Sequence, residues 1–274
     1  MDPRTVKTET RYGAMYVPKA DTYIGRSLVQ YGEWTQRELA VIGQLIKPGM
    51  VVADVGANIG THTLAMAKMV GAAGQVVAFE PQPFTFRILS TNLLVNGCRN
   101  VVAINAGVGS QEAWIDVPEL DYEKPTNFGA LNIGGRTRSI ADVTARMPVP
   151  QLKLDDVPVM RDVRLIKIDV EGMEEAVIAG SSNLIERNRP ILYVENECPG
   201  DTSESLIRVI QDLHYEIYWD IAPLFSESNY NRKKEDIFGK IVCINMLCVP
   251  SDRDHRVTNF RQLKDPKEHP RATR

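Results

Sequence analysis

The sequence lacks several features that would assign it to a functional class directly. It has no excess of basic residues, since 32 Lys and Arg stand against 35 Asp and Glu for a formal net charge of −3. No global positive field therefore marks it as a nucleic-acid-binding protein. Its four cysteines form no CxxC pair and have no zinc-like spacing with its four histidines. We therefore expect reduced thiols, no zinc site and no nucleic-acid partner.

Long apolar runs are also missing. The most apolar stretch near the end, Ile241 to Pro250, is too short to span a bilayer and is typical of a buried strand. The opening stretch, MDPRTVKTETRYG, is polar and has no apolar region of the kind found in signal peptides. We therefore expect a cytoplasmic protein without a membrane partner.

Strand-like runs and helical patterns alternate between residues 35 and 213. The first helix is predicted to begin at Thr35, because Thr35 and Glu38 have the spacing of a capping box. The strands that we expect in this part are 51–55, 75–80, 101–106, 163–169 and 190–196. Such alternation predicts an α/β protein whose mostly parallel sheet has helices on both faces. Two further apolar segments, 215–221 and 240–249, predict an antiparallel pair at the sheet edge.

The expected domain organisation is one α/β domain over residues 35–250. Residues 1–34 form an N-terminal extension, and the polar composition of 251–274 predicts a loose C-terminal tail. Residues 107–157 are rich in Gly, Pro and Asp, and the alternation pauses there. We therefore expect an insertion over 107–157 rather than a second domain.

The stretch VVADVGANIGTHT combines the end of a strand, a turn and the start of a helix. A dinucleotide would favour GxGxxG, but this turn lacks the middle glycine, and Asp54 would repel a pyrophosphate. Glu80, at the end of the next strand, is the expected partner of a ribose diol. A ligand with a ribose and an ammonium group but no phosphate is S-adenosylmethionine. The alternative is a tight turn with no ligand.

Four segments occur in an order and spacing that resemble a known family: DVGANIGTHT, VVAFEPQP, LIKIDVEGMEEAVIAG and NMLCVP. They are similar to the motifs of the FkbM family of S-adenosylmethionine-dependent methyltransferases, over about Tyr31 to Pro250. The resemblance implies a class I, Rossmann-like methyltransferase fold. This fold has a seven-stranded, mostly parallel sheet with an antiparallel last strand. It also implies O-methylation of a hydroxyl on a sugar or a polyketide-type small molecule.

The same resemblance implies the residues that hold the cofactor. They are Asp54, Gly56, Asn58, Gly60, Thr61, His62, Glu80 and Ala106. Asp54 is expected to face the methionine ammonium and Glu80 to bind the ribose. Thr61 and His62 begin a helix, whose positive end suits the methionine carboxylate. Many relatives carry an aromatic residue where Thr61 and His62 stand, which is a departure from the family pattern.

Acidic and amide side chains at the ends of the fourth and fifth strands are the candidates for catalysis. These residues are Asp169, Glu171, Glu195 and Asn196. Either one carboxylate acts as a general base, or Asp169, Glu195 and Asn196 together bind a divalent cation such as Mg²⁺. Two other interpretations are that Glu171 only caps the following helix and that Lys167 pairs with one of the acids. We favour the metal-free version, because nothing that follows Asp169 adds a further clear ligand.

The function that we expect is O-methylation of a sugar or another small-molecule acceptor. A non-catalytic S-adenosylmethionine-binding protein with this fold is the alternative, and an NAD-dependent oxidoreductase is the least favoured class. Residues 218–239 mix aromatic rings with amides and hydroxyls, which suits a carbohydrate as well as a plain surface loop. The sequence indicates neither the acceptor nor the oligomeric state.

Overall fold

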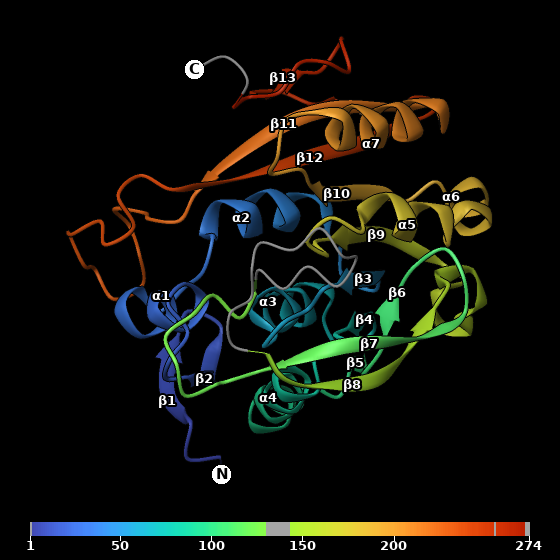
Figure 1. The fold of residues 1–274 in the computed structure, drawn as a ribbon. Coiled ribbons are helices and arrows are strands. Elements are labelled where there is room, and N and C mark those ends of the chain that lie inside the picture. Colours follow the sequence, from blue (N-terminus) through green and yellow to red (C-terminus); the bar gives the residue numbers. More distant parts are fainter. Residues whose placement is uncertain (1, 130–142, 255, 272–274) are drawn as a thin grey trace.

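An eight-stranded sheet forms the centre of the computed structural model, which describes residues 2–129, 143–254 and 256–271 (Figure 1). Its strand order is β13-β11-β12-β10-β9-β3-β4-β5. Five neighbouring strands run parallel: β3 (Val51–Val55), β4 (Gln75–Phe79), β5 (Val101–Ile104), β9 (Val163–Ile168) and β10 (Ile191–Glu195). The predicted α/β alternation and the five strands are therefore confirmed.

The other three strands make the sheet mixed. They are β11 (Tyr215–Pro223), β12 (Val242–Pro250) and β13 (Arg261–Gln262). Strand β12 runs antiparallel to both β10 and β11, which confirms the antiparallel pair, whereas β13 adds a further strand outside β11. The prediction of seven strands is therefore wrong by one. The two-residue β13 lies in a polar segment and has no apolar run that could mark it as a strand.

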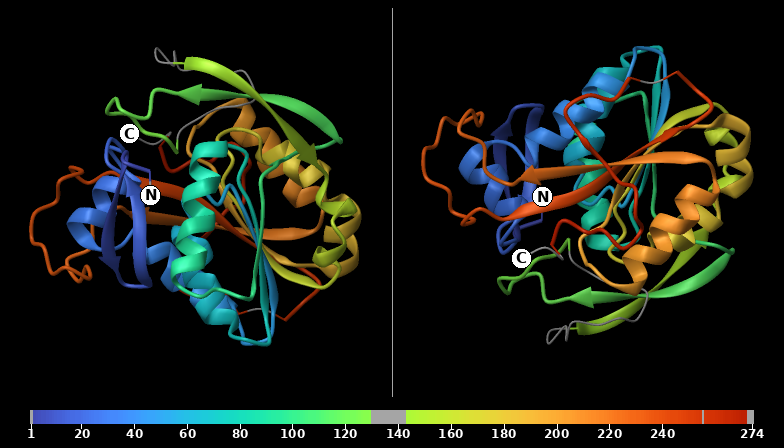
Figure 2. Two further views of the ribbon diagram at one scale, coloured as in Figure 1. Left: turned by 90° about the horizontal axis from the view of Figure 1, so that it is seen from below. Right: turned by 90° about the horizontal axis from the view of Figure 1, so that it is seen from above.

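Helices cover both faces of the sheet, as predicted (Figure 2). One face packs against α2 (Gln36–Leu45), α3 (Thr61–Val70) and α4 (Pro83–Val95), and the other against α5 (Glu174–Ala179), α6 (Ser182–Asn188) and α7 (Asp201–Asp212). The alternation of side chains along each strand supplies both cores. In β3, Val52 packs with Ile42 and Met66 on the first face, while Ala53 packs on the second.

Residues 107–152 contain a second, smaller sheet. Its strands are β6 (Gly107–Val108), β7 (Ala113–Leu120) and β8 (Val143–Leu152), in the order β6-β8-β7. Two short 3₁₀ turns, Leu154–Asp156 and Pro158–Met160, then lead into β9. Part of the predicted insertion, residues 130–142, lies outside the described residues.

The N-terminal residues form a hairpin of β1 (Thr5–Thr10) and β2 (Gly13–Pro18), followed by α1 (Ile24–Tyr31). Asn92 on α4 joins this hairpin to the central domain. Its side-chain oxygen accepts from the Tyr16 amide at 2.6 Å, and its nitrogen donates to the carbonyls of Tyr16 and Ile59 at 3.1 and 2.9 Å. The hairpin is thereby fixed next to the turn that contains Ile59.

No helix among the described residues has the length and apolar character needed to cross a membrane.

The segment after residue 260 is not loose, and that expectation is wrong. Strand β13 pairs with β11, and the Leu263 side chain is buried in the main core. His269 is buried as well, with its ring edge-on to that of Trp219. The polar composition did not reveal these contacts, because only two side chains are buried among the described residues 261–271.

Candidate functional site

The glycine turn connects β3 to α3 at the carboxyl end of the sheet. Gly56 and Gly60 have φ angles of 84° and 90°, and Asn58 between them has a φ of 49°. These are left-handed conformations, which glycine adopts without cost and asparagine tolerates. A Cβ on Gly56 would lie 1.7 Å from the Asp169 carbonyl oxygen, so the turn packs directly against the end of β9. The glycines therefore bring the turn and the Asp169 strand end together.

Glu80 follows β4 and is buried beside this turn. Its Oε2 accepts from the Asn58 amide at 2.8 Å, and its Oε1 accepts from the Gln82 amide and the Thr85 hydroxyl at 2.8 Å each. Burial raises the pKa of Glu80 to about 7, against the opposing effect of these three hydrogen bonds. The carboxylate thus organises the turn. Its Oε1 already accepts two hydrogen bonds, whereas Oε2 accepts one and retains capacity for a further bond.

Asp54 is the next-to-last residue of β3 and is fully buried between β4 and β9. Its Oδ2 accepts from the Thr63 hydroxyl at 2.6 Å, while its Oδ1 has no hydrogen-bond partner in the described part of the chain. The Lys167 ammonium lies 3.6 Å from that Oδ1 and 3.1 Å from Asp169 Oδ2. Burial disfavours the charged form of Lys167, but the charges of Asp169 and Asp54 outweigh it and raise its pKa.

Three carboxylates meet at the ends of β9 and β10. One oxygen each from Asp169, Glu171 and Glu195 lies within 4.8 Å of the others. All three are half-buried, and the Asp169 side chain is 36% exposed. Glu171 is held at a φ of 54°, a conformation that costs a residue with a Cβ roughly 1–2 kcal/mol. The structure therefore brings together the three residues that we predicted as catalytic.

The pKa values of Asp169 and Glu195, the acids at the two strand ends, are shifted in opposite directions. Burial opposes ionisation of Asp169, but the charge and hydrogen bond of Lys167 outweigh burial and lower the pKa of Asp169. Burial and the charges of Asp169 and Glu171 raise the pKa of Glu195 well above its usual value. The neighbouring Glu195 carboxyl also lowers the pKa of Asp169. An ionised Asp169 beside a protonated Glu195 is therefore the state that the geometry favours.

The alternative metal set that we predicted included Asn196. This residue is buried, and its side-chain nitrogen lies 3.4 Å from the Met246 sulfur. Glu171 is the third carboxylate beside Asp169 and Glu195, and a ligand role of the Asn196 amide oxygen stays a prediction. Glu174 does not join them, because its Oε1 accepts from the amides of Val170 and Gly172 and caps the loop instead.

Thr61 and His62 begin α3 and are both buried. His62 Nε2 lies 3.1 Å from Glu38 Oε2 and 3.4 Å from Thr35 Oγ1. The other Glu38 oxygen accepts from Asn245 Nδ2 at 3.2 Å. The capping-box prediction is therefore wrong. Thr35 has a φ of 40° and its side chain makes no hydrogen bond that caps the helix. The Glu38 side chain contacts His62 and Asn245 instead of the start of its own helix.

Sequence reasoning missed some of these residues and underrated others. Lys167 was considered only as an alternative partner of an acid, although a lysine inside the apolar strand VRLIKID is a signal of a buried ion pair. Thr63 and Asn245 were missed, because single polar residues beside apolar runs carry no pattern. Glu38 was assigned a local role that its contacts do not bear out.

Residues 128 and 129 lie over the glycine turn and the end of β4. Gln82 Nε2 donates to the Phe128 carbonyl at 3.0 Å, and Gly129 lies against the Asn58 side chain. Ala106, which we predicted next to the cofactor, is fully buried beyond β5. A cavity of 240 Å³ lies elsewhere, beside the N-terminal hairpin. It is lined by Pro3, Arg4, Lys19, Ala20, Tyr122 and Glu123, and none of these is a predicted site residue. The chemistry of the strand ends, rather than this cavity, identifies the candidate site.

Known proteins resemble this chain over the region just described. The family model of the methyltransferase FkbM domain matches residues 54–217. "31-O-demethyl-FK506 methyltransferase FkbM" of Streptomyces tacrolimicus is 31% identical over an alignment of 210 residues, and the match covers 67% of this chain and 79% of the relative. "Methyltransferase 1" of Beauveria bassiana (strain ARSEF 2860) is 28% identical over an alignment of 145 residues, and that match covers 47% of this chain and 57% of the relative.

The chain spans 57% and 59% of the lengths of the Beauveria bassiana relative and of "Methyltransferase sdnD" from Sordaria araneosa. Among solved structures, a methyltransferase FkbM from Methylobacillus flagellatus KT matches 77% of this chain and 50% of its own length. The identity is 14% and the TM-score 0.43.

Proposed function

Because the chain belongs to the FkbM methyltransferase family, we propose that it transfers a methyl group from S-adenosylmethionine to a hydroxyl of a small acceptor. A sugar or another natural product is the acceptor class that we infer. The observation that carries the proposal is that the glycine turn packs against Asp169 at the end of β9, next to Glu195 at the end of β10. The oxygen in the name of the Streptomyces relative, a 31-O-demethyl-FK506 methyltransferase, supports an oxygen as the methyl acceptor.

The residues around the turn fit S-adenosylmethionine. The buried Asp54 Oδ1 accepts no hydrogen bond, although the Lys167 ammonium lies 3.6 Å away, and a buried carboxylate oxygen of this kind suits an ammonium donor. Glu80 Oε2 can accept from a ribose hydroxyl in addition to the Asn58 amide. The backbone at Gly56, Asn58 and Gly60 would cradle the ligand, with Thr61 and His62 at the helix start near the carboxylate. Ala106 would border the adenine.

When bound, the cofactor supplies an electrophilic methyl group, and the protein must supply alignment and a base. We assign the base to Asp169, because Lys167 keeps it ionised and its side chain is partly exposed. In this assignment an Asp169 carboxylate oxygen would accept the hydroxyl proton of the acceptor, while bound S-adenosylmethionine would supply the methyl group by cleavage of its sulfur–methyl bond and leave as S-adenosylhomocysteine. A protonated Glu195 next to Asp169 would donate a hydrogen bond that orients the base, and Glu171 lies beside both.

A metal-assisted version is the second mechanism, and one observation favours it: Asp169, Glu171 and Glu195 are close enough to share one cation. We favour the metal-free version, because Lys167 already supplies a positive charge 3.1 Å from Asp169. A divalent cation here would be repelled by that ammonium group.

The test of this function is a titration of the purified protein with S-adenosylhomocysteine and with NAD, followed by calorimetry. We expect micromolar binding of the first and none of the second, because the turn lacks the glycine that a pyrophosphate needs. A screen of sugars and other polyols with a methyl-labelled donor then identifies the acceptor. Binding of S-adenosylhomocysteine without any methyl transfer would favour the non-catalytic alternative, and tight binding of NAD would refute the proposal.

A further inference from the structure

The segment 261–271 is anchored in the protein at two buried side chains. Leu263 is 4% exposed, and its amide donates to the Ile217 carbonyl at 2.8 Å. His269 is 5% exposed, and its ring centre lies 5.2 Å from that of Trp219. This course carries the segment from the edge of the sheet to the carboxyl end of β10, where Glu195 stands.

Both ring nitrogens of His269 have partners. Nε2 lies 2.9 Å from the Asn196 carbonyl oxygen, and Nδ1 accepts from the Arg271 amide at 3.1 Å. A carbonyl only accepts and an amide N–H only donates, so His269 is neutral with its hydrogen on Nε2. Burial also lowers the pKa of His269, which favours this neutral form. The ring therefore holds the carbonyl of Asn196, the residue that directly follows Glu195.

Arg271 contacts Glu197, the residue that follows Asn196. Its guanidinium pairs with Glu197 Oε2 and donates to the Val242 carbonyl at 3.3 Å. The other Glu197 oxygen accepts from the Ile244 amide at 2.7 Å, and the Asn196 amide donates to the Ile244 carbonyl at 2.9 Å. The two residues after Glu195 are thus fixed between β12 and the segment 261–271.

We propose that His269 and Arg271 are positioning residues that hold the end of β10 and thereby keep Glu195 against Asp169. The inference rests on the proposed methyl transfer, in which Glu195 orients the base. Small displacements of such groups are costly in catalysis, since an error of about 1 Å can lower a rate roughly 100-fold. The charge on Glu197 also acts on Glu195, so Arg271 shields the carboxyl pair from a further negative charge.

The experiment compares His269→Ala and Arg271→Ala with Arg261→Ala in the full chain. Arg261 lies in the same segment and pairs with Glu268 on the surface, so it is a matched control with no contact to β10 in the described residues. We expect kcat to fall about 10- to 100-fold in the two test variants and to stay unchanged in the control. The affinity for S-adenosylhomocysteine should not change, because its residues lie on the other strand ends. His269→Gln retains an N–H donor and should recover part of kcat.

Hydrogen exchange gives a second readout that needs no acceptor. We expect faster amide exchange confined to residues 191–198 and 242–246 in both test variants and not in Arg261→Ala. Wild-type kcat in folded test variants would overturn the inference, and so would a general loss of protection across the chain, which indicates only a structural role. Failure of the wild type to bind S-adenosylhomocysteine would refute the proposed function instead, while the exchange pattern would still decide whether the segment holds β10.

Discussion

Glu80 is a single carboxylate that serves both the turn and the proposed ribose site. We expect Glu80→Ala to weaken S-adenosylhomocysteine binding about 10- to 150-fold, because hydrogen bonds to a charged group contribute roughly 1.5–3 kcal/mol. The pKa of Glu80 is raised to about 7, and ribose hydroxyls donate best to the ionised form. The dissociation constant of the wild type should therefore rise as the pH falls below about 7. Titration calorimetry over this pH range measures both effects, and a pH-independent affinity would argue against ribose binding by Glu80.

Asp169 is the residue on which the two mechanisms differ. If it is the base, Asp169→Asn should lower kcat about 10²- to 10⁴-fold with little change in cofactor affinity. Its pKa lies below the usual 3.8, so the wild-type rate should show no loss from this group as the pH falls through the neutral range. EDTA should leave turnover unchanged. Inhibition by EDTA that Mg²⁺ reverses would establish the metal-assisted version, and wild-type turnover in Asp169→Asn would exclude both.

The β3–α3 turn is the element on which cofactor binding depends, and its two glycines should respond differently to substitution. In Gly56→Ala the new Cβ would meet the Asp169 carbonyl at 1.7 Å, which is backbone and cannot move aside. In Gly60→Ala it would meet the end of the Leu89 side chain at 2.6 Å, which can rotate. Each also places an L-residue at positive φ, at a cost of roughly 1–2 kcal/mol. We therefore expect Gly60→Ala to stay folded with impaired cofactor binding and Gly56→Ala to lose much more stability.

Thermal unfolding and S-adenosylhomocysteine titration of the two variants test this difference. Equal melting temperatures would show that the contact between the turn and Asp169 is not rigid. Normal ligand binding in a folded Gly60→Ala would show that the turn is only a structural connection.

Elements were predictable from sequence where the pattern is local and repeated. Five buried parallel strands and the β11–β12 pair followed from continuous apolar runs, which single residues do not change. The hairpin of β1 and β2 and the short β13 were not predicted, because their burial depends on packing against distant elements. Glu38 shows the same limit at a single position. Its spacing predicted a cap, but a partner 207 residues away, Asn245, helps to orient its side chain.

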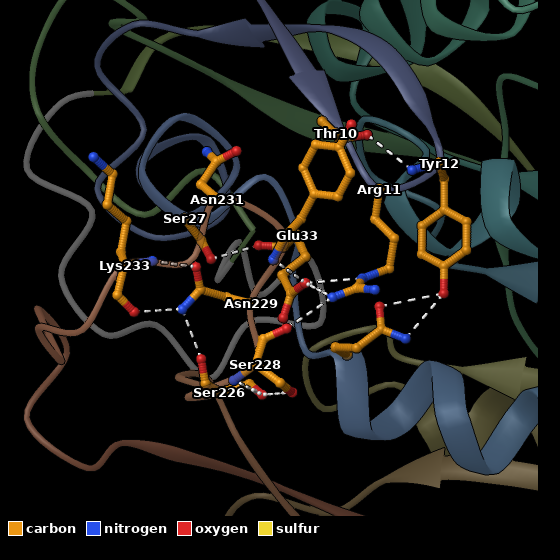
Figure 3. Close-up of polar contacts among 12 residues, drawn as sticks. Thr10, Arg11, Tyr12, Ser27, Glu33, Ser226, Ser228, Asn229, Asn231 and Lys233 are labelled. Carbon is orange, nitrogen blue, oxygen red and sulfur yellow. Dashed lines mark hydrogen bonds and ion pairs between the residues drawn. The ribbon is translucent and has the colours of Figure 1, made fainter.

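At the scale of the whole molecule, a buried acid is one of the contacts that join the N-terminal region to the long loop between β11 and β12. Figure 3 shows Glu33 beside Arg11, with Ser228 from the loop next to them. Glu33 Oε2 accepts from Arg11 at 2.7 and 2.9 Å and from the Tyr230 amide at 2.9 Å, and Arg11 also donates to the Ser228 carbonyl at 3.0 Å. Glu33 is 5% exposed, so the loop is fixed to the protein interior rather than to its surface.

The contacts of Glu33 predict that its substitution changes amide exchange in the loop over residues 224–241, which is far from Glu33 in sequence. In Glu33→Ala the loop loses its charged acceptor, whose hydrogen bonds contribute roughly 1.5–3 kcal/mol. Amide exchange should therefore become faster in the loop, whereas Glu9→Ala, at an exposed acid of the β1–β2 hairpin, should leave it unchanged. If the loop also contacts the acceptor, as its aromatic and amide side chains led us to expect, Glu33→Ala should raise the acceptor KM and leave cofactor affinity unaltered. Unchanged loop exchange would show that Glu33 does not hold it, while faster exchange with an unchanged KM would place the acceptor elsewhere.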